Sequence, residues 1–452
     1  MNVTSSLLSS QQNFTAFETT LESVWYVGVS AVDITPPVGM WLAGYAMRDR
    51  PAESTIHNLW VKAVVLQDKE GNKGVIVGSD ILGFTRELSE RIKQRISKDL
   101  NIPPESVLLN SSHTHSGPVI ENSLMPIYPI EGTDQIEKVK KYTTDLEEKV
   151  FQVVKNAVNN IKPAQVYYGK GLVRFAVNRR NNRESEIENQ FEFRGPVDYS
   201  VPVFVAKLLE DDTITAIIFG YACHATVLSG YQWCGDYPGF AQEELQNKFP
   251  TAVAVFMAGC GADINPLPRR RVSLARQYGK ELASAVEGVM EEGLEVLPSK
   301  LITRLKRITL ELETPKSKEE LEQIANDPNQ LDYMRRSAIY LLRDLANGIP
   351  LRTSYDYPVQ VWSVGGTPLI ALAGEVVVDY AIYVKQRLGK NVVVLGYSNE
   401  LMSYIPSVRV LREGGYEGDT SQLEYGMPAK WKESIEERIL SAVESLWNEI
   451  QR

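Results

Sequence analysis

Apolar and polar residues follow one another in short blocks, and these blocks switch between the period of a strand and that of a helix. Two apolar, β-branched runs at residues 61–66 and 74–78 predict strands joined by a turn at 68–72. The charged stretch 87–100 has helical periodicity and ends at residues 101–104. The same reasoning predicts further strands at 107–110, 215–222, 252–258, 359–364, 367–373 and 391–395, and helices at 144–160, 272–291, 315–347 and 431–450.

Strands that alternate with helices indicate a layered α/β fold with a mixed central sheet flanked by helices. Gly365 and Gly366 separate two of the predicted strands, and paired glycines supply the positive φ of a tight hairpin. The chain contains no Pro/Ser-rich linker, low-complexity tract or internal repeat. We therefore expect an N-terminal arm at residues 1–24 and a single domain at 25–452.

Composition narrows the class of protein. The 43% hydrophobic and 23% charged residues are typical of a globular chain, and a net charge of −9 argues against nucleic acid as a partner. No apolar run approaches the roughly 20 residues that a membrane-spanning helix requires. These features favour a small-molecule or lipid-like substrate and leave the oligomeric state undetermined.

Cysteine content and the N-terminal sequence bear on localisation. The N-terminus has neither a basic start nor a long apolar block, so it does not resemble a secretion signal. Cys223, Cys234 and Cys260 are too few for a disulfide framework, which favours a reducing compartment. We expect a cytoplasmic protein, and export with a single Cys223–Cys234 bridge stays open.

Polar side chains collect just after several predicted strands. His113 and His115 follow the strand at 107–110, and His224 follows the one at 215–222. Asn265 comes shortly after the strand at 252–258, and Glu375 comes directly after the strand at 367–373. Ligands of open α/β sheets bind where such strand ends and their loops converge. Segments far apart in the sequence therefore share an expected meeting place at the C-terminal ends of the strands.

Three of the four histidines belong to this set. Neutral imidazole is a common zinc ligand, and zinc hydrolases use about three protein ligands and keep one position for water. If the loop twists between His113 and His115, one ring can bind metal while the other faces substrate. Taken alone, a His-x-His pair is also what an unremarkable loop tip contains, so both interpretations are open on the residues themselves.

Residues 110–118 read Asn-Ser-Ser-His-Thr-His-Ser-Gly-Pro, which resembles the signature of the neutral/alkaline non-lysosomal ceramidases, a family of zinc amidases. Other stretches that agree with this family in order are residues 27–36, His57, Asp80, Asn178-Arg179, residues 224–226, residues 373–375 and residues 403–407. The resemblance extends from Trp25 to Gly418. It implies an α/β zinc amidase.

The resemblance also implies residue roles. One Zn²⁺ per chain would be held by His113, His224, Glu375 and Tyr404, and His115 would orient a ligand or face the substrate. Water activated by the metal would attack the amide carbon. The metal and His115 would stabilise the oxyanion, and His115 or Tyr404 would deliver a proton to the leaving amine.

Two departures from the family pattern affect the expected chemistry. The family has a serine with an active-site role next to a proline, and Asn265 occupies that position here. Asparagine can hydrogen-bond a substrate but cannot act as a nucleophile. Ceramidases also carry a C-terminal immunoglobulin-like domain, which we do not expect in this chain. A smaller or more polar N-acyl substrate than ceramide is therefore a credible expectation.

Other polar residues have a structural and a functional interpretation each. Arg179 could form a surface salt bridge or anchor a substrate oxygen. Asp236 could tie down its loop or contact substrate. Asp80 could orient a ligand histidine. Cys260, within Ala-Gly-Cys-Gly, favours tight packing over a role as a thiolate nucleophile.

We therefore expect a zinc-dependent hydrolase, ceramidase-like and connected with lipid or sphingolipid metabolism, that cleaves the amide bond of an N-acylated small molecule or lipid. Two alternatives stay open. The same site could serve a zinc esterase or lactonase, since an ester is attacked more easily than an amide. Asn265 also leaves open a non-catalytic, ceramidase-like binding protein.

Overall fold

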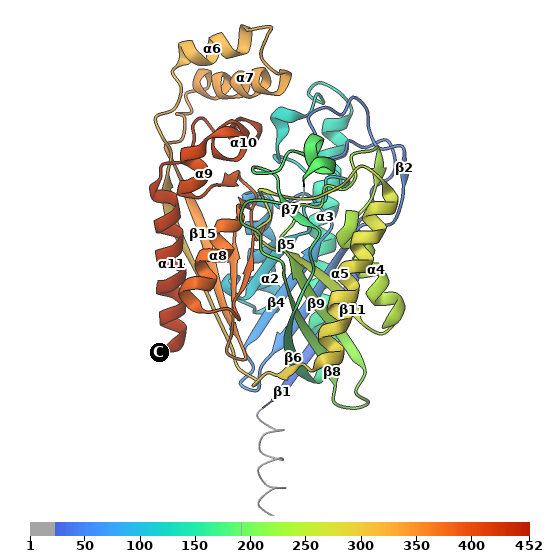
Figure 1. Cartoon of the computed structure of the whole chain (residues 1–452). Helices are drawn as coiled ribbons and strands as arrows, with labels where there is room; N and C mark the ends of the chain where they lie inside the picture. Colours follow the sequence, from blue (N-terminus) through green and yellow to red (C-terminus); the bar gives the residue numbers. More distant parts are fainter. Residues whose placement is uncertain (1–22, 191) are drawn as a thin grey trace, which may run out of the picture.

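Two β-sheets lie face to face between two layers of helices (Figure 1). The computed structural model describes residues 23–190 and 192–452, so most of the predicted N-terminal arm lies outside the described residues. The nine-stranded sheet has the order β11-β9-β8-β6-β1-β3-β4-β5, with β13 added beside β6. Its strands are β1 (Val24–Asp33), β3 (Trp60–Gln67), β4 (Lys73–Ser79), β5 (Val107–Ser111), β6 (Lys162–Leu172), β8 (Ser200–Leu208), β9 (Ile214–Tyr221), β11 (Val253–Ala258) and β13 (Glu295–Val296).

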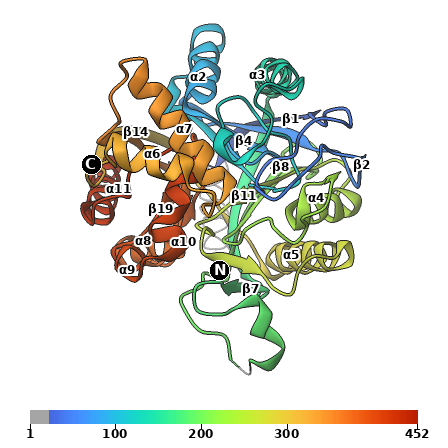
Figure 2. The same ribbon diagram turned by 90° about the horizontal axis from the view of Figure 1, so that it is seen from above.

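This sheet is mixed. The pairs β4–β5 and β9–β11 are parallel, and the neighbouring pairs between them are antiparallel. One face is covered by α2 (Arg86–Leu100), α3 (Gln135–Asn159), α4 (Asp236–Lys248) and α5 (Val272–Glu292) (Figure 2). Strand β3 shows how side chains are divided between the faces, because Val61, Ala63 and Val65 belong to the core shared with these helices. Val64 and Leu66 point to the other face, as the two-residue period of a strand requires.

The other face packs against a second sheet with the order β14-β15-β16-β18. Its strands are β14 (Leu301–Glu311), β15 (Ser354–Val364), β16 (Thr367–Leu372) and β18 (Val393–Leu395). Trp362 and Leu369 of this sheet share a fully buried cluster with Ile76 and Leu108 of the first. Each side chain of this kind contributes about 1.5–3 kcal/mol when it is removed from water. The outer face of the second sheet is covered by α8 (Val378–Leu388) and α11 (Ser434–Gln451).

A helical hairpin rises above the edge of the sheets at which β5, β9 and β11 end (Figures 1 and 2). It consists of α6 (Lys318–Asn326) and α7 (Asp332–Ala346), and Leu321, Ala338 and Leu341 form its small core. The guanidinium of Arg336 on α7 donates to the carbonyl oxygens of Pro126 and Ile127 at 2.7 and 3.1 Å. These bonds fasten the hairpin to the loop that precedes α3.

Short elements complete the chain and shape its loops. They are β2 (Ser54–Thr55), β7 (Ala176–Asn178), β10 (Gln232–Trp233), β12 (Ile264–Pro266), β17 (Glu375–Val376), β19 (Tyr404–Ile405), α9 (Val408–Glu413), α10 (Gly415–Gly418), and the 3₁₀ turns η1 (Pro104–Ser106), η2 (Met125–Ile127), η3 (Glu184–Asn189) and η4 (Thr420–Tyr425). Within the described part of the chain, no helix has the length and apolarity needed to cross a membrane.

The predicted fold class, a mixed sheet flanked by helices, is confirmed, and the second sheet adds a layer to it. The hairpin is also confirmed, with Gly365 and Gly366 at φ values of 58° and 89°. Helix α3 begins nine residues before the predicted start at 144, since the Lys and Glu side chains of its first turns obscure the buried positions Gln135, Val139 and Thr143. Strand β14 was not predicted because Arg304, Lys306 and Arg307 interrupt its apolar residues, and most of its side chains are only partly buried.

Candidate active site

Four chain segments bring the predicted site residues together. His113 follows β5 by two residues in a left-handed conformation (φ 58°), which turns the loop back over the strand end. His224 follows β9 by three residues. Glu375 and Tyr404 open the short strands β17 and β19, which pair in parallel with these two residues directly opposite each other. The pairing makes Glu375 and Tyr404 neighbours although 28 positions separate them.

The imidazoles of His113 and His224 are oriented by main-chain carbonyl groups. Nδ1 of His113 donates to the oxygen of Leu82 at 2.7 Å, and Nδ1 of His224 donates to the oxygen of Gly261 at 2.7 Å. A carbonyl can only accept, so the proton lies on Nδ1 and the lone pair on Nε2. Both Nε2 atoms face the same carboxylate oxygen, Oε2 of Glu375, at 3.3 and 3.0 Å. Two buried nitrogen lone pairs and one carboxylate oxygen thus face one another.

Burial and charge set the protonation of this cluster. Burial lowers the pKa of His224 to about 4, and the positive charge of Arg179 adds to the effect, so the ring is neutral at pH 7. Burial by itself would raise the pKa of Glu375, but the neighbouring His113 and His224 hold it well below its usual range. The hydroxyl of Tyr425 also donates to Oε1 of Glu375. The site therefore combines the neutral imidazole of His224 with an ionised carboxylate.

These donors have the spacing of a metal site. The ligand atoms of His113, His115 and His224 all lie within 4.8 Å of one another. Around a tetrahedral zinc ion with bonds near 2.05 Å, ligand atoms are separated by roughly 3.3 Å. Oε2 of Glu375 lies 3.3 Å from Nε2 of His113 and 3.0 Å from Nε2 of His224, close to that spacing. Imidazole nitrogens fixed by carbonyl groups beside a carboxylate are also the chemistry that zinc prefers, so the residues fit a zinc ion.

His115 differs from the other two histidines. Its Nε2 lies 3.2 Å from Nε2 of His113, and its Nδ1 has no hydrogen-bond partner among the described residues. Gly44 closes over the ring, and a Cβ there would lie 2.4 Å from Nδ1 of His115. The buried guanidinium of Arg48 donates to the carbonyl oxygen of His115 at 2.7 Å. The main chain of His115 is thus fixed while its ring is free of a carbonyl partner.

Arg179 connects two of the predicted residues, Tyr404 and Asn265, with Glu417. Its guanidinium donates to the hydroxyl of Tyr404 at 3.1 Å, to Oδ1 of Asn265 at 3.4 Å and to Oε1 of Glu417 at 2.7 Å. Burial raises the pKa of Tyr404 well above its usual range, and the charge of Glu375 adds to this. Arg179 therefore holds Tyr404 and Asn265 side by side at the edge of the histidine cluster.

A cavity of about 630 Å³ opens beside the cluster. Its lining includes His115, Arg179, Asn265 and Tyr404, and this volume lies in the range of small-molecule sites. Asp236, which the sequence placed at the substrate, is not among the described residues that line it. Its carboxylate is fully buried and accepts from the backbone amides of Val227, Leu228 and Tyr237. The geometry thus gives Asp236 the loop-tying role that was its structural interpretation.

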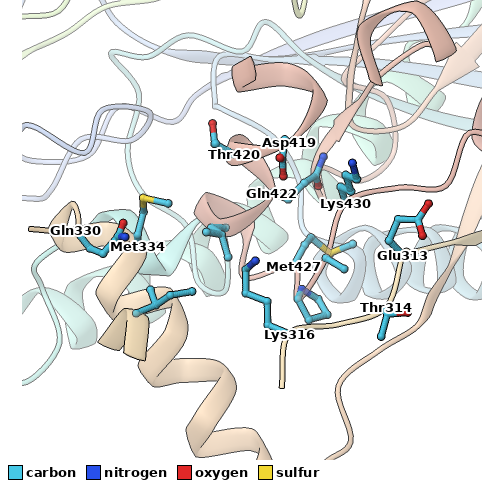
Figure 3. A pocket seen from close by; sticks show the side chains of 14 residues that line it. Glu313, Thr314, Lys316, Gln330, Met334, Asp419, Thr420, Gln422, Met427 and Lys430 are labelled. Carbon is cyan, nitrogen blue, oxygen red and sulfur yellow. The ribbon is translucent and has the colours of Figure 1, made fainter. Parts of the chain in front are cut away.

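Other residues singled out by the sequence lie away from the cluster. His57 and Asp80 line a separate polar cavity of about 310 Å³, where Nε2 of His57 lies 3.3 Å from Sγ of Cys234. Cys223, Cys234 and Cys260 are buried free thiols. A third cavity of about 440 Å³ lies between the α6–α7 hairpin and residues 419–430 (Figure 3). It contains none of the clustered histidines, so the cavity beside His115 is the candidate active site.

The structure adds residues that the sequence did not suggest. Tyr425 contacts Glu375, and Tyr416, which lines the cavity, donates to Glu424 at 2.7 Å. Burial raises the pKa of Glu424 to about 7. All three residues come from the segment that contains α10 and η4, in which no apolar period or motif marks a site. Their role depends on the way this segment folds back over β17 and β19.

Comparisons with known proteins point to one family. The family model described as neutral/alkaline non-lysosomal ceramidase, N-terminal, matches residues 25–255. The neutral ceramidase of Drosophila pseudoobscura pseudoobscura is 24% identical over 265 residues, and neutral ceramidase A of Dictyostelium discoideum is 25% identical over 231 residues. These alignments cover 54% and 49% of this chain but only 36% and 31% of the relatives, about a third of their length.

The fold is also that of a solved member. The crystal structure of neutral ceramidase from Pseudomonas aeruginosa superposes with a TM-score of 0.69 at 16% identity, over 93% of this chain and 75% of that one. The family model covers just over half of the 452 residues and includes both His113 and His224. The chain therefore belongs to the neutral/alkaline non-lysosomal ceramidase family.

Proposed function

We propose that this protein is a zinc-dependent amidohydrolase that cleaves the amide bond of an N-acylated small molecule or lipid with water as the nucleophile. The observation that carries the proposal is the pair His113 and His224, each with Nδ1 fixed on a carbonyl oxygen and Nε2 directed at Glu375. His113, His224 and Glu375 would hold the ion, with Tyr404 as the fourth ligand. When bound there, zinc would supply a Lewis acid and lower the pKa of a water molecule.

The chain's own residues then account for binding and proton movement. His115 lines the cavity, and burial lowers its pKa well below the usual range, so its ring is neutral and can accept a proton at pH 7. It can pass that proton to the leaving amine. When Tyr404 is detached from the ion, its hydroxyl keeps its proton because burial raises its pKa, and the bond from Arg179 fixes its position. Both groups can stabilise an oxygen on which negative charge develops.

Asn265 decides what kind of nucleophile the site can use. It lines the cavity beside Arg179 but has no hydroxyl to attack a carbonyl carbon. Asn265 therefore cannot be the nucleophile, and the proposal assigns the attack to water. An esterase or lactonase would use the same groups, so substrate class is a matter for measurement. A non-catalytic binding protein would keep the metal cluster without turnover. The cytoplasmic location remains a prediction.

Metal content and hydrolysis measured together test the proposal. Zinc per chain is determined for wild type, His113→Ala and His224→Ala, with each protein screened on N-acyl amides and the matching esters. His57→Ala is the control, because it removes a histidine that lines a separate cavity. About one zinc per chain, lost with hydrolysis in the two site variants only, is expected. Zinc without turnover of any substrate would favour a binding protein, and no zinc in the wild type would refute the mechanism.

A further inference from the structure

The cavity beside the histidine cluster has a polar wall. Six of its lining residues are charged, and each belongs to an ion pair: Arg179–Glu417 at 2.7 Å, Arg180–Glu413 at 3.0 Å, Arg180–Glu417 at 2.6 Å and Arg269–Glu184 at 2.6 Å. Among the described residues that line the cavity, Leu267 is the one aliphatic side chain. The rest of its apolar surface comes from the rings of Tyr45, Tyr404 and Tyr416, so an alkyl chain meets aromatic faces and paired ions and no cluster of aliphatic side chains.

Two lining side chains have hydrogen-bonding groups that the protein itself leaves unused. Thr226 is 2% exposed, and its hydroxyl has no partner in the described chain. Asn265 is 4% exposed and accepts from Arg179 through Oδ1, but its amide nitrogen donates to no group in the part of the chain that the structure describes. A buried polar group without a partner is costly, so a ligand that bonds to it gains affinity. Hydroxyl groups can do so as donors and as acceptors.

We infer that the substrate, on the basis of the proposed amidohydrolase function, is a short-chain N-acyl derivative of a hydroxyl-rich amine without an alkyl tail, such as an amino sugar. A buried methylene group normally strengthens binding roughly fourfold, but only against apolar surface. Here a long acyl or sphingoid chain would cover paired ions and remove them from water, which opposes binding. A ring with several hydroxyl groups instead finds Thr226, Asn265 and the ion pairs as partners.

The cavity of Figure 3 does not provide an alternative channel for a chain. It contains apolar side chains, among them Met334, Leu423 and Met427, but it shares no lining residue with the cavity beside His115. The turn η4 lines it with Leu423 and places Tyr425 against Glu375. A chain that crossed from one cavity to the other would displace the turn that supports the site.

A matched set of amides tests the inference on the zinc-loaded protein. Wild type is assayed with N-acetylglucosamine, N-hexanoylglucosamine, N-hexanoylcyclohexylamine and N-palmitoylsphingosine in detergent micelles. The two hexanoyl compounds share a six-membered ring and differ in its polar groups, namely the hydroxyl groups, the hydroxymethyl group and the ring oxygen. We expect kcat/KM to be at least roughly tenfold higher for the hydroxylated ring, as one or two hydrogen bonds would give. The lipid should be the poorest substrate.

Variants assign the preference to the cavity wall. Asn265→Leu and Thr226→Val should reduce the preference for the hydroxylated ring several-fold, and Thr226→Ser should retain it. Thr144→Val is the control, since it makes the same change on the exposed surface of α3. Binding of glucosamine and cyclohexylamine, followed by calorimetry, gives a readout that does not need turnover and keeps the inference testable if a variant folds poorly.

The outcomes separate the inference from the proposed function. Hydrolysis of N-palmitoylsphingosine at an equal or higher kcat/KM than N-hexanoylglucosamine would overturn the inference and leave the amidohydrolase standing. Failure to cleave any amide or ester, with zinc bound, would overturn the proposed function. In that case, binding of glucosamine but not of cyclohexylamine would still support recognition of hydroxyl groups, and equal binding or none would overturn it.

Discussion

Tyr425 supports the carboxylate of Glu375, and its replacement by phenylalanine should weaken zinc binding without removing a proposed ligand. Glu375 is 2% exposed, so water cannot easily replace a lost donor. The hydroxyl of Tyr425 donates to Oε1, while Oε2 faces His113 and His224. Such support fixes the orientation of a ligand carboxylate.

The expected magnitude follows from the kind of bond that is lost. A hydrogen bond to a charged group contributes about 1.5–3 kcal/mol, and the acceptor here is an ionised, buried carboxylate. Since about 1.4 kcal/mol corresponds to a factor of ten, the dissociation constant for zinc should rise roughly 10- to 100-fold. The phenylalanine ring keeps the packing of η4 against the site.

Competition with a chromogenic chelator measures this affinity for wild type and Tyr425→Phe. Tyr383→Phe is the control, because its hydroxyl also donates to a carboxylate, that of Asp379 at 3.4 Å, but on the outer helix α8. The control should bind zinc like wild type. An unchanged affinity in Tyr425→Phe would refute the argument that this hydroxyl orients a ligand.

Three further predictions concern the surroundings of the site. Gly44→Ala should lower kcat but leave zinc bound, because the added Cβ would lie 2.4 Å from Nδ1 of His115 and the backbone φ of Gly44 is 92°. Metal analysis and kinetics check this prediction, and an unchanged kcat would contradict it. Asp236→Asn should reduce the free energy of unfolding by about 1–3 kcal/mol and leave KM unchanged, since the carboxylate oxygens of Asp236 accept from backbone amides. A raised KM at wild-type stability would instead indicate that Asp236 contacts the substrate. Burial lowers the pKa of Lys93 to about 7, so between pH 7 and 10 the unfolded chain binds more protons and stability rises with pH. Urea unfolding should therefore show wild type gaining about 2–3 kcal/mol over Lys93→Met from pH 7 to 9, and parallel pH profiles would exclude this.

The elements that the sequence revealed are those whose pattern is local. Strands β3, β4, β5, β9 and β11 and helices α2 and α5 were predicted within a residue or two, because each buries a continuous run or one regular face. Strands β6, β8 and β14 were not predicted; in β6 and β14, polar residues interrupt the apolar pattern. The packing of two sheets against each other was not predicted, as no local signal shows which strands share a sheet.

The candidate site shows the same division. The sequence by itself determined the donors, namely His113, His224 and Glu375 after strands or at strand ends, and the resemblance of residues 110–118 supplied their grouping. Only the tertiary structure decided that Nε2 of both histidines faces one carboxylate oxygen, since that depends on carbonyl groups of Leu82 and Gly261 in other segments.

The tertiary structure also shows that Asp236 does not line the candidate substrate cavity and that Tyr425 contacts Glu375. Both outcomes depend on loop geometry, in which backbone amides compete with substrate for a carboxylate and a distant turn folds back over β17. The sequence alone specifies the residue types needed for zinc chemistry, because each chemical group belongs to one residue. Their distances, protonation and cavity are properties of the packed fold, because burial and neighbouring charges arise only when distant segments meet.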